Sequence, residues 1–149
     1  MSKKRKQDSK IRGNPKIIIA AIAVVAIFSG LSFYLGMATP HSFSLPIVLS
    51  GSMTLSLDYQ TSATYGPFHT GVRVTFEVTD ASHPWTLSVH DSDGNPVGSL
   101  SSSTAGLHET TWLYSPNGCT IWIHSTASVP AAMNLDGTLT ITSSRFPFI

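Results

Sequence analysis

An uncharged stretch of 22 residues near the amino terminus, Ile17–Ala38, constrains this chain more than any other feature. At ~1.5 Å per helical residue it spans about 33 Å, more than the ~30 Å hydrocarbon thickness of a bilayer. Isoleucine, valine and alanine would occupy every face of such a helix, which distinguishes it from an amphipathic surface helix. The stretch therefore predicts one transmembrane helix.

Charged residues divide sharply on either side of that stretch. Residues 1–16 carry seven lysines and arginines and one acid, a net charge of +6, whereas residues 39–149 carry two arginines and seven acids, a net charge of −5. The positive-inside rule then predicts a cytoplasmic basic tail at residues 1–16 and an exported domain at residues 39–149. A cleaved signal peptide ending at Gly36-Met37-Ala38 is the alternative, although signal sequences usually have a shorter apolar region of ~7–15 residues. We expect a single-pass cell-membrane protein that contacts membrane lipid and has no nucleic-acid partner.

Residues 39–149 are rich in serine and threonine, and apolar side chains alternate with polar ones over short stretches. A period of two is typical of strands, and turn signals such as Asp93-Gly94, Pro116–Gly118 and Asp136-Gly137 separate the stretches. The pattern predicts one all-β sandwich or jelly roll of seven or eight antiparallel strands. The expected strands are Phe43–Leu49, Met53–Tyr59, Val72–Val78, Trp85–Val89, Pro96–Leu100, Leu107–Tyr114, Cys119–Ile123 and Leu139–Ile141.

A serine motif follows the apolar stretch by about a dozen residues. The segment Leu45–Met53 resembles the nucleophile segment of signal peptidases of the endoplasmic-reticulum and archaeal type, which also carry one amino-terminal anchor. The resemblance implies Ser52 as the catalytic nucleophile, and such a serine needs a base to remove its proton. The family takes that base from a histidine-arginine pair or a lysine, and residues 39–149 contain neither. An active or degenerate peptidase is therefore an alternative to a non-enzymatic role.

One cysteine, Cys119, excludes an intrachain disulfide framework and a cysteine-cluster zinc site. Cys119, His124 and Met133 follow in an order that resembles the copper ligands of blue-copper domains. On a continuous strand, however, Cys119 and His124 point to opposite faces. We expect no cofactor and no metal, and keep a copper protein as a further alternative.

Three tryptophans are a large aromatic content for a domain of this size. Trp122 falls on the strand face opposite Cys119 and Ile121, so that either both faces of this strand are covered or Trp122 is an exposed anchor. Exposed tryptophans are frequent at the centres of protein interfaces. We name Trp122 and Trp112 as candidate interaction residues.

Several strand and turn patterns resemble the GOLD β-sandwich of the p24 membrane-trafficking family. They are Val74–Val78, Trp85–His90, Asp93–Val97, Gly118–Ile123 and Gly137–Thr142. That family is anchored at its carboxyl end and contains a disulfide, whereas this chain has an amino-terminal anchor and one cysteine. The resemblance implies a binding module rather than an enzyme.

These observations predict a membrane-anchored, extracytoplasmic β-sandwich that binds proteins as an accessory subunit of a membrane or surface assembly. Its partners would be other membrane or surface proteins, including further copies of itself, and uncharged strand edges would provide the contact. A pilin-like filament subunit is the last alternative, because a hydrophobic amino-terminal helix before a β-rich head is that architecture. Arg12-Gly13 resembles a prepilin cleavage point, but Asn14–Lys16 interrupts the apolar run that should follow it.

Overall fold

The computed structural model describes residues 15–66 and 68–145, which form two compact units divided after Gly36. Helix α1, Pro15–Ala38, makes up the described part of the first unit and ends two residues past the division. It contains the whole predicted transmembrane stretch, and Pro15–Leu35 is long and apolar enough to cross a membrane. Proline is well suited to the first turn of a helix, because an N–H there has no helical partner. Most of the predicted basic tail, residues 1–14, lies outside the described residues.

The second unit consists of seven strands, and every pair of neighbours is antiparallel. The predicted fold class, one apolar helix before a jelly-roll-like antiparallel β domain, is confirmed. The strands are β1 (His41–Thr64), β2 (Gly71–Ala81), β3 (Trp85–Asp91), β4 (Pro96–Ser102), β5 (Gly106–Glu109), β6 (Leu113–Tyr114) and β7 (Gly118–Ser144).

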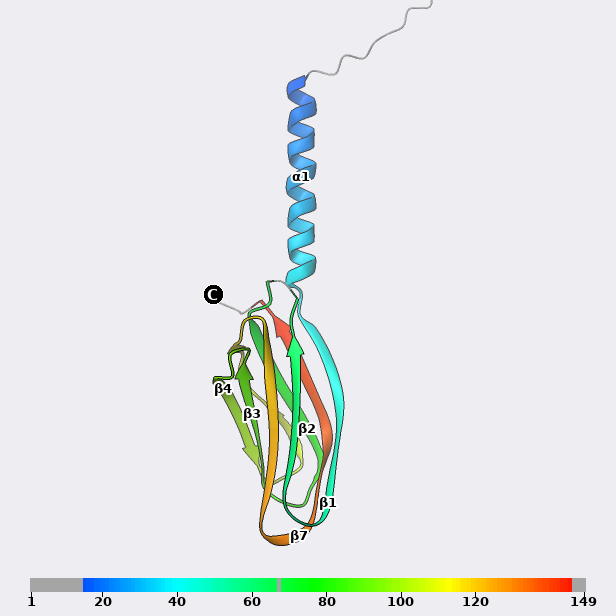
Figure 1. The fold of residues 1–149 in the computed structure, drawn as a ribbon. Coiled ribbons are helices and arrows are strands. Elements are labelled where there is room, and N and C mark those ends of the chain that lie inside the picture. The colour runs from blue at the N-terminus through cyan, green and yellow to red at the C-terminus, as the bar shows by residue number, and fades with distance from the viewer. Residues whose placement is uncertain (1–14, 67, 146–149) are drawn as a thin grey trace, which may run out of the picture. The chain divides into compact units, whose positions relative to one another are not determined.

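Strands β1 and β7 are much longer than predicted, because each joins two of the expected strands. They pair from His41 opposite Ser143 to Thr64 opposite Gly118, with register shifts between Gly51 and Ser56. At these shifts both strands bend and run back, as Figure 1 shows at the lower end of the domain. We call this region the bend and define it as residues 51–56 of β1 and 127–131 of β7.

The two halves of β1 and β7 belong to two layers that face each other (Figure 1). In the first layer the order is β4, β3, residues 118–126 of β7 and residues 56–64 of β1. In the second layer it is residues 41–51 of β1, residues 133–144 of β7, β2, and then β5 and β6. β1 is therefore an edge strand in both layers.

The expected turn at Asp136-Gly137 is wrong, since both residues lie inside β7. A Cβ atom at Gly137 would lie 2.4 Å from the carbonyl oxygen of Glu77 and 2.9 Å from the Phe76 ring. Glycine is thus present because strand β2 approaches closely, and not because the chain turns. The turn at Asp93-Gly94 is confirmed between β3 and β4, where Gly94 has a positive φ of 86°.

The core lies between the two layers and is filled by the alternate side chains that the sequence marks as apolar. Phe76 of the second layer meets Trp85 of the first edge-to-face, with ring centroids 5.2 Å apart. Both rings are fully buried. The other fully buried large side chains are Ile47, Val72, Val74, Leu87, Val89, Ile121, Ile123, Leu135, Leu139 and Ile141.

Candidate functional site

The outer face of the first layer carries an exposed tryptophan at its centre. Trp122 lies on β7 between Ser88 of β3 and Gln60 of β1 in the register of the sheet. Its side chain is 51% exposed, because the core is filled from the other face of β7 by Cys119, Ile121 and Ile123. Of the two possibilities that the sequence left open, Trp122 is therefore exposed rather than covered, and its role as an anchor stays a prediction.

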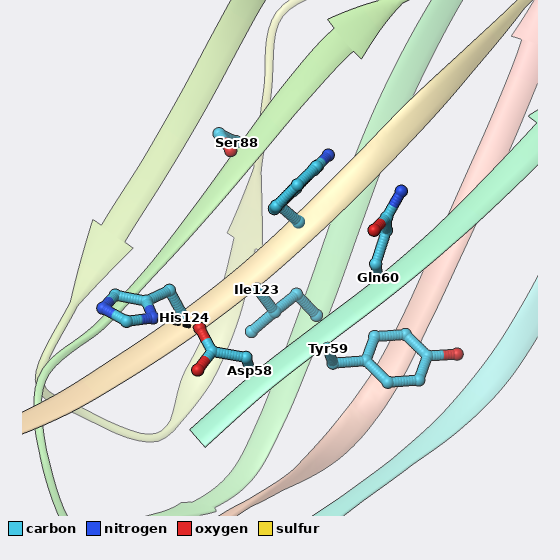
Figure 2. Close-up of a pocket in the computed structure, with 7 residues that line it drawn as sticks. Asp58, Tyr59, Gln60, Ser88, Ile123 and His124 are labelled. Carbon is cyan, nitrogen blue, oxygen red and sulfur yellow. Dashed lines mark hydrogen bonds and ion pairs between the residues drawn. The ribbon is translucent and has the colours of Figure 1, made fainter. Parts of the chain in front are cut away.

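Polar side chains from three strands surround this ring. In the row next to Trp122, Asp58 of β1 lies opposite His124 of β7, and Figure 2 shows the carboxylate beside the imidazole. On the other side, His90 of β3 lies with its ring centroid 6.1 Å from that of Trp122. We call Asp58, Gln60, Ser88, His90, Trp122 and His124 the Trp122 face.

Hydrogen bonds hold several of these side chains in place. The His124 ring bonds to the Asp58 carboxylate through Nδ1. The two ring nitrogens of His90 bond to the Gly94 carbonyl oxygen at 3.1 Å and to Ser88 Oγ at 3.2 Å. A site whose groups are held before a ligand arrives loses less conformational entropy on binding.

The charge of the Trp122 face is small. Asp58 supplies a carboxylate, and its hydrogen bond with His124 holds the pKa of that carboxyl below its ordinary value, together with a bond of 3.1 Å that Ser56 Oγ donates. Lysine is absent from residues 39–149, and the two arginines, Arg73 and Arg145, lie on β2 and directly after β7. The face consequently presents one carboxylate among other hydrogen-bonding groups, without lysine or arginine.

A pocket of about 480 Å³ opens on this face and is lined by Trp122 together with residues of β1 and β3 (Figure 2). This volume falls within the ~300–1,000 Å³ typical of small-molecule sites. The lining residues are Asp58, Tyr59, Gln60, Ser88, Trp122, Ile123 and His124.

A second feature is the open edge of β1. Among the described residues, β1 pairs with β7 and with no other strand. Over its 24 residues Asp58 is the only Asp, Glu, Lys or Arg. Apolar side chains are exposed at and beside the bend, where Val48, Met53 and Val129 are 75%, 77% and 64% exposed. Unpaired backbone groups along such an edge are a template for a further strand.

The predicted nucleophile Ser52 lies in the bend and is exposed. Met53, next to it, has a positive φ of 56°. Among the described residues, Ser52 has no hydrogen bond to a histidine, lysine or carboxylate that would act as a base. The peptidase therefore stays a prediction that rests on the local motif.

The predicted copper ligands occupy different environments. Cys119 and Met133 are buried, whereas His124 is exposed on the opposite face of β7 and bonded to Asp58. Burial raises the pKa of the Cys119 thiol, which opposes the thiolate that copper requires. Within residues 15–66 and 68–145 no group of three His, Cys, Asp or Glu side chains could hold a metal ion.

Trp112, the other candidate interaction residue, lies before β6 at the second layer and is half-buried. The Arg73 guanidinium stacks over its ring at 5.2 Å, and the same guanidinium contacts Glu109 at 3.4 Å. The surroundings of Trp112 are thus already occupied by its own domain.

Sequence reasoning missed Asp58, Gln60, Ser88 and His90, because alternation gives the face of a side chain but not the register between strands.

No protein-family model matches the chain, and no curated protein matches it. The resemblances to the p24 family and to signal peptidases accordingly stay predictions. Among solved structures, the chain is similar to a pilus subunit of Bacillus endospore appendages, with 13% identity and a TM-score of 0.40 over 71% of this chain and 88% of the other.

It is similar at the same identity and TM-score to VP2 of an infectious bursal disease virus subviral particle, over 72% of this chain and 34% of VP2. This chain thus corresponds to about a third of that viral protein. Likeness at this level assigns neither a family nor a function.

Proposed function

We propose that the chain is a membrane-anchored structural subunit whose β domain assembles with further copies of itself through strand edges. The observation that carries the proposal is the edge of β1, which among the described residues pairs with β7 alone and has Asp58 as its one charged side chain. Natural proteins usually protect such edges with lysines, prolines, bulges or covering segments. β1 has Pro46 and the bend, but residues 57–64 form a regular edge without lysine.

The opposite edge of the same layer supplies a matching partner. β4, seven residues long, contains no charged residue and pairs with β3 alone among the described strands. An added β4 from a second copy would continue the first layer beyond β1. Such a contact joins two different surfaces, so it repeats from copy to copy and produces a ring or an open filament.

Anchoring supports this assembly if α1 stays in the membrane with residues 1–16 in the cytoplasm, as the charge distribution predicts. Copies confined to one membrane surface meet at a raised effective concentration, so that each edge contact can be individually weak. The basic tail then fixes the side of the membrane on which the edges meet.

Single lysines at the two edges test the pairing. Thr61 and Ser102 are half-buried residues at the outer strands of the first layer, at inward-facing register positions opposite Ile121 and Trp85. A lysine there can extend its amine into solvent at an open edge, but would be buried when a strand is added. Light scattering of the full chain in mild detergent, and cross-linking in membranes, would report the assembly.

We expect oligomers from the unmodified chain and monomers from Thr61→Lys or Ser102→Lys alone. An equimolar mixture of the two variants would form dimers only, since one keeps a free β4 and the other a free β1. Thr75→Lys on β2, a half-buried threonine paired with Glu109 of β5 and with Thr140 of β7, is the matched control and should assemble normally. A monomeric unmodified chain without cross-linked species contradicts the proposal, and dimers of Ser102→Lys alone would indicate pairing between two β1 edges.

A further inference from the structure

The position of Trp122 has no explanation in the folding of the domain. Its ring lies on the outer face of a sheet whose inner face already supplies the core. Large apolar side chains are otherwise exposed on this domain mostly near the bend or the strand ends, whereas the register neighbours of Trp122, Gln60 and Ser88, are polar. A single indole surrounded by hydrogen-bonding side chains suits a ligand that has both an apolar face and a polar rim.

From this arrangement we propose that the Trp122 face is a binding site for neutral saccharides. A sugar ring has an apolar face of C–H groups that can stack on the indole, and its hydroxyl groups project sideways toward hydrogen-bonding side chains. Gln60 and Ser88 lie on either side of Trp122 in its own row, and Asp58 lies in the next row. Stacking supplies affinity, and the polar groups select the sugar.

Charge favours a neutral sugar over an anionic one. The Trp122 face has one carboxylate and neither lysine nor arginine, the side chains that most readily bind a phosphate, sulfate or uronate. The hydrogen bond with His124 leaves the second Asp58 oxygen, Oδ2, to accept from Ser56 Oγ or from a sugar hydroxyl. Hydrogen bonds to a carboxylate are stronger than those between neutral groups.

The polar neighbourhood also separates this site from a protein interface. Interface centres bury aromatic anchors in well-packed surroundings that exclude water. The row of Trp122 instead continues into Ser99 of β4, and the next row reaches Thr120 and Ser62, whose hydroxyls bond each other at 3.0 Å. The lining of the pocket of about 480 Å³ includes the polar side chains of Asp58, Gln60, Ser88 and His124. These groups can hydrogen-bond a saccharide that stacks on the indole.

The test uses the full chain in a zwitterionic detergent, because maltoside and glucoside detergents would themselves present sugars. Calorimetry would measure binding of cellohexaose, mannohexaose and chitohexaose, with an acidic hexagalacturonate for comparison. We expect at least one neutral hexasaccharide to bind with a Kd on the order of 10 μM to 1 mM, and the acidic one to bind more weakly.

Variants then assign the binding to the face. Trp122→Ala should weaken binding at least about tenfold, and Trp122→Phe should fall between it and the unmodified chain. Trp112→Ala is the matched control, because it removes a tryptophan of the second layer, and should bind normally. The Thr61→Lys chain should also bind the sugar. This variant therefore tests saccharide binding independently of the edge pairing.

Three results would overturn the proposal. They are no binding of any neutral hexasaccharide up to about 10 mM, equal binding by the Trp122→Ala and Trp112→Ala chains, and tighter binding of the acidic sugar. If no sugar binds and Trp122→Ala also loses its oligomers, the face is instead a contact between copies.

Discussion

The two halves of β7 share one strand and one partner, β1, yet their outer faces differ. Residues 133–144 present threonines that bond to serines of β1, with Ser42 to Thr142 and Ser44 to Thr140 both at 2.8 Å between hydroxyl oxygens. Residues 118–126 have one such pair, Thr120 with Ser62 at 3.0 Å, and also present Trp122 and His124. Both halves bury the same kind of apolar side chain on the inner face.

This difference distinguishes outer side chains that stabilise the fold from outer side chains that the fold tolerates without needing them. Threonine is favoured in strands, and cross-strand hydroxyl pairs are ordinary sheet contacts, so the second half is explained by stability alone. An exposed tryptophan next to a histidine–aspartate pair contributes little that a threonine would not. Stability therefore leaves Trp122 and His124 without an explanation, and the proposed saccharide site would supply one.

The largest test compares two tryptophans of the first layer. Trp85→Ala should lower the free energy of unfolding by about 3–5 kcal/mol, because it empties a fully buried site against Phe76. Trp122→Ala should change it by less than about 0.5 kcal/mol. Thermal unfolding followed by near-ultraviolet circular dichroism would compare them, and similar losses for both would show that Trp122 is structural.

Two groups on the inner side of the first layer, Tyr65 and Cys119, should lower the stability of the fold at alkaline pH. Burial, then contact with Cys119, raises the pKa of Tyr65, and burial raises that of the Cys119 thiol. Groups with a raised folded-state pKa stabilise the fold below their unfolded values, and this contribution is lost as the pH rises above about 9. Unfolding midpoints between about pH 8 and pH 11 should fall more steeply for the unmodified chain than for Cys119→Ala. Parallel curves would contradict this assignment.

The threonine pairs of the second half should matter less. Thr140→Val keeps the β-branched shape and removes the hydroxyl that bonds to Ser44, so we expect a loss of about 0.5 kcal/mol. Thr138→Val is a control, because Thr138 lies on the same face of β7 and no bond of its hydroxyl to β1 is seen among the described residues. An unfolding midpoint that drops equally in both variants would mean that the hydroxyl pair adds nothing.

The smallest effect concerns the hydrogen bond between His124 and Asp58 on the outer face of residues 118–126. The pKa of Asp58 is lowered in the folded chain, so its contribution is present above the ordinary value of 3.8 and is lost as the pH falls through the folded value. Both side chains are largely exposed, so the contribution is small. Asp58→Asn should therefore shift the midpoint slightly at neutral pH and not at all in strong acid. A loss that persists in acid would point to packing rather than charge.

Much of the fold could be predicted from local patterns, and much of the site could not. The uncharged stretch predicted α1 to within a few residues, and alternation identified the inward face at Val72–Val78 and Cys119–Ile123. The turn predicted at Asp136-Gly137 was wrong, because a glycine required by close strand approach looks the same in sequence as one in a turn. The Trp122 face draws on β1, β3 and β7, and only long-range register brings Gln60 and Ser88 to either side of one ring.

The pairing of the first strand with the last has a consequence for how the chain acquires its structure. His41 faces Ser143 across about a hundred residues, and β7 is the common neighbour of β1, β2 and β3. Neither layer can therefore close until β7 has emerged from the ribosome. Contacts so distant in sequence make folding slow, so a newly made chain should remain open for longer than a helical domain of equal length. During that interval its unpaired strands are available to a neighbouring nascent copy or to a chaperone.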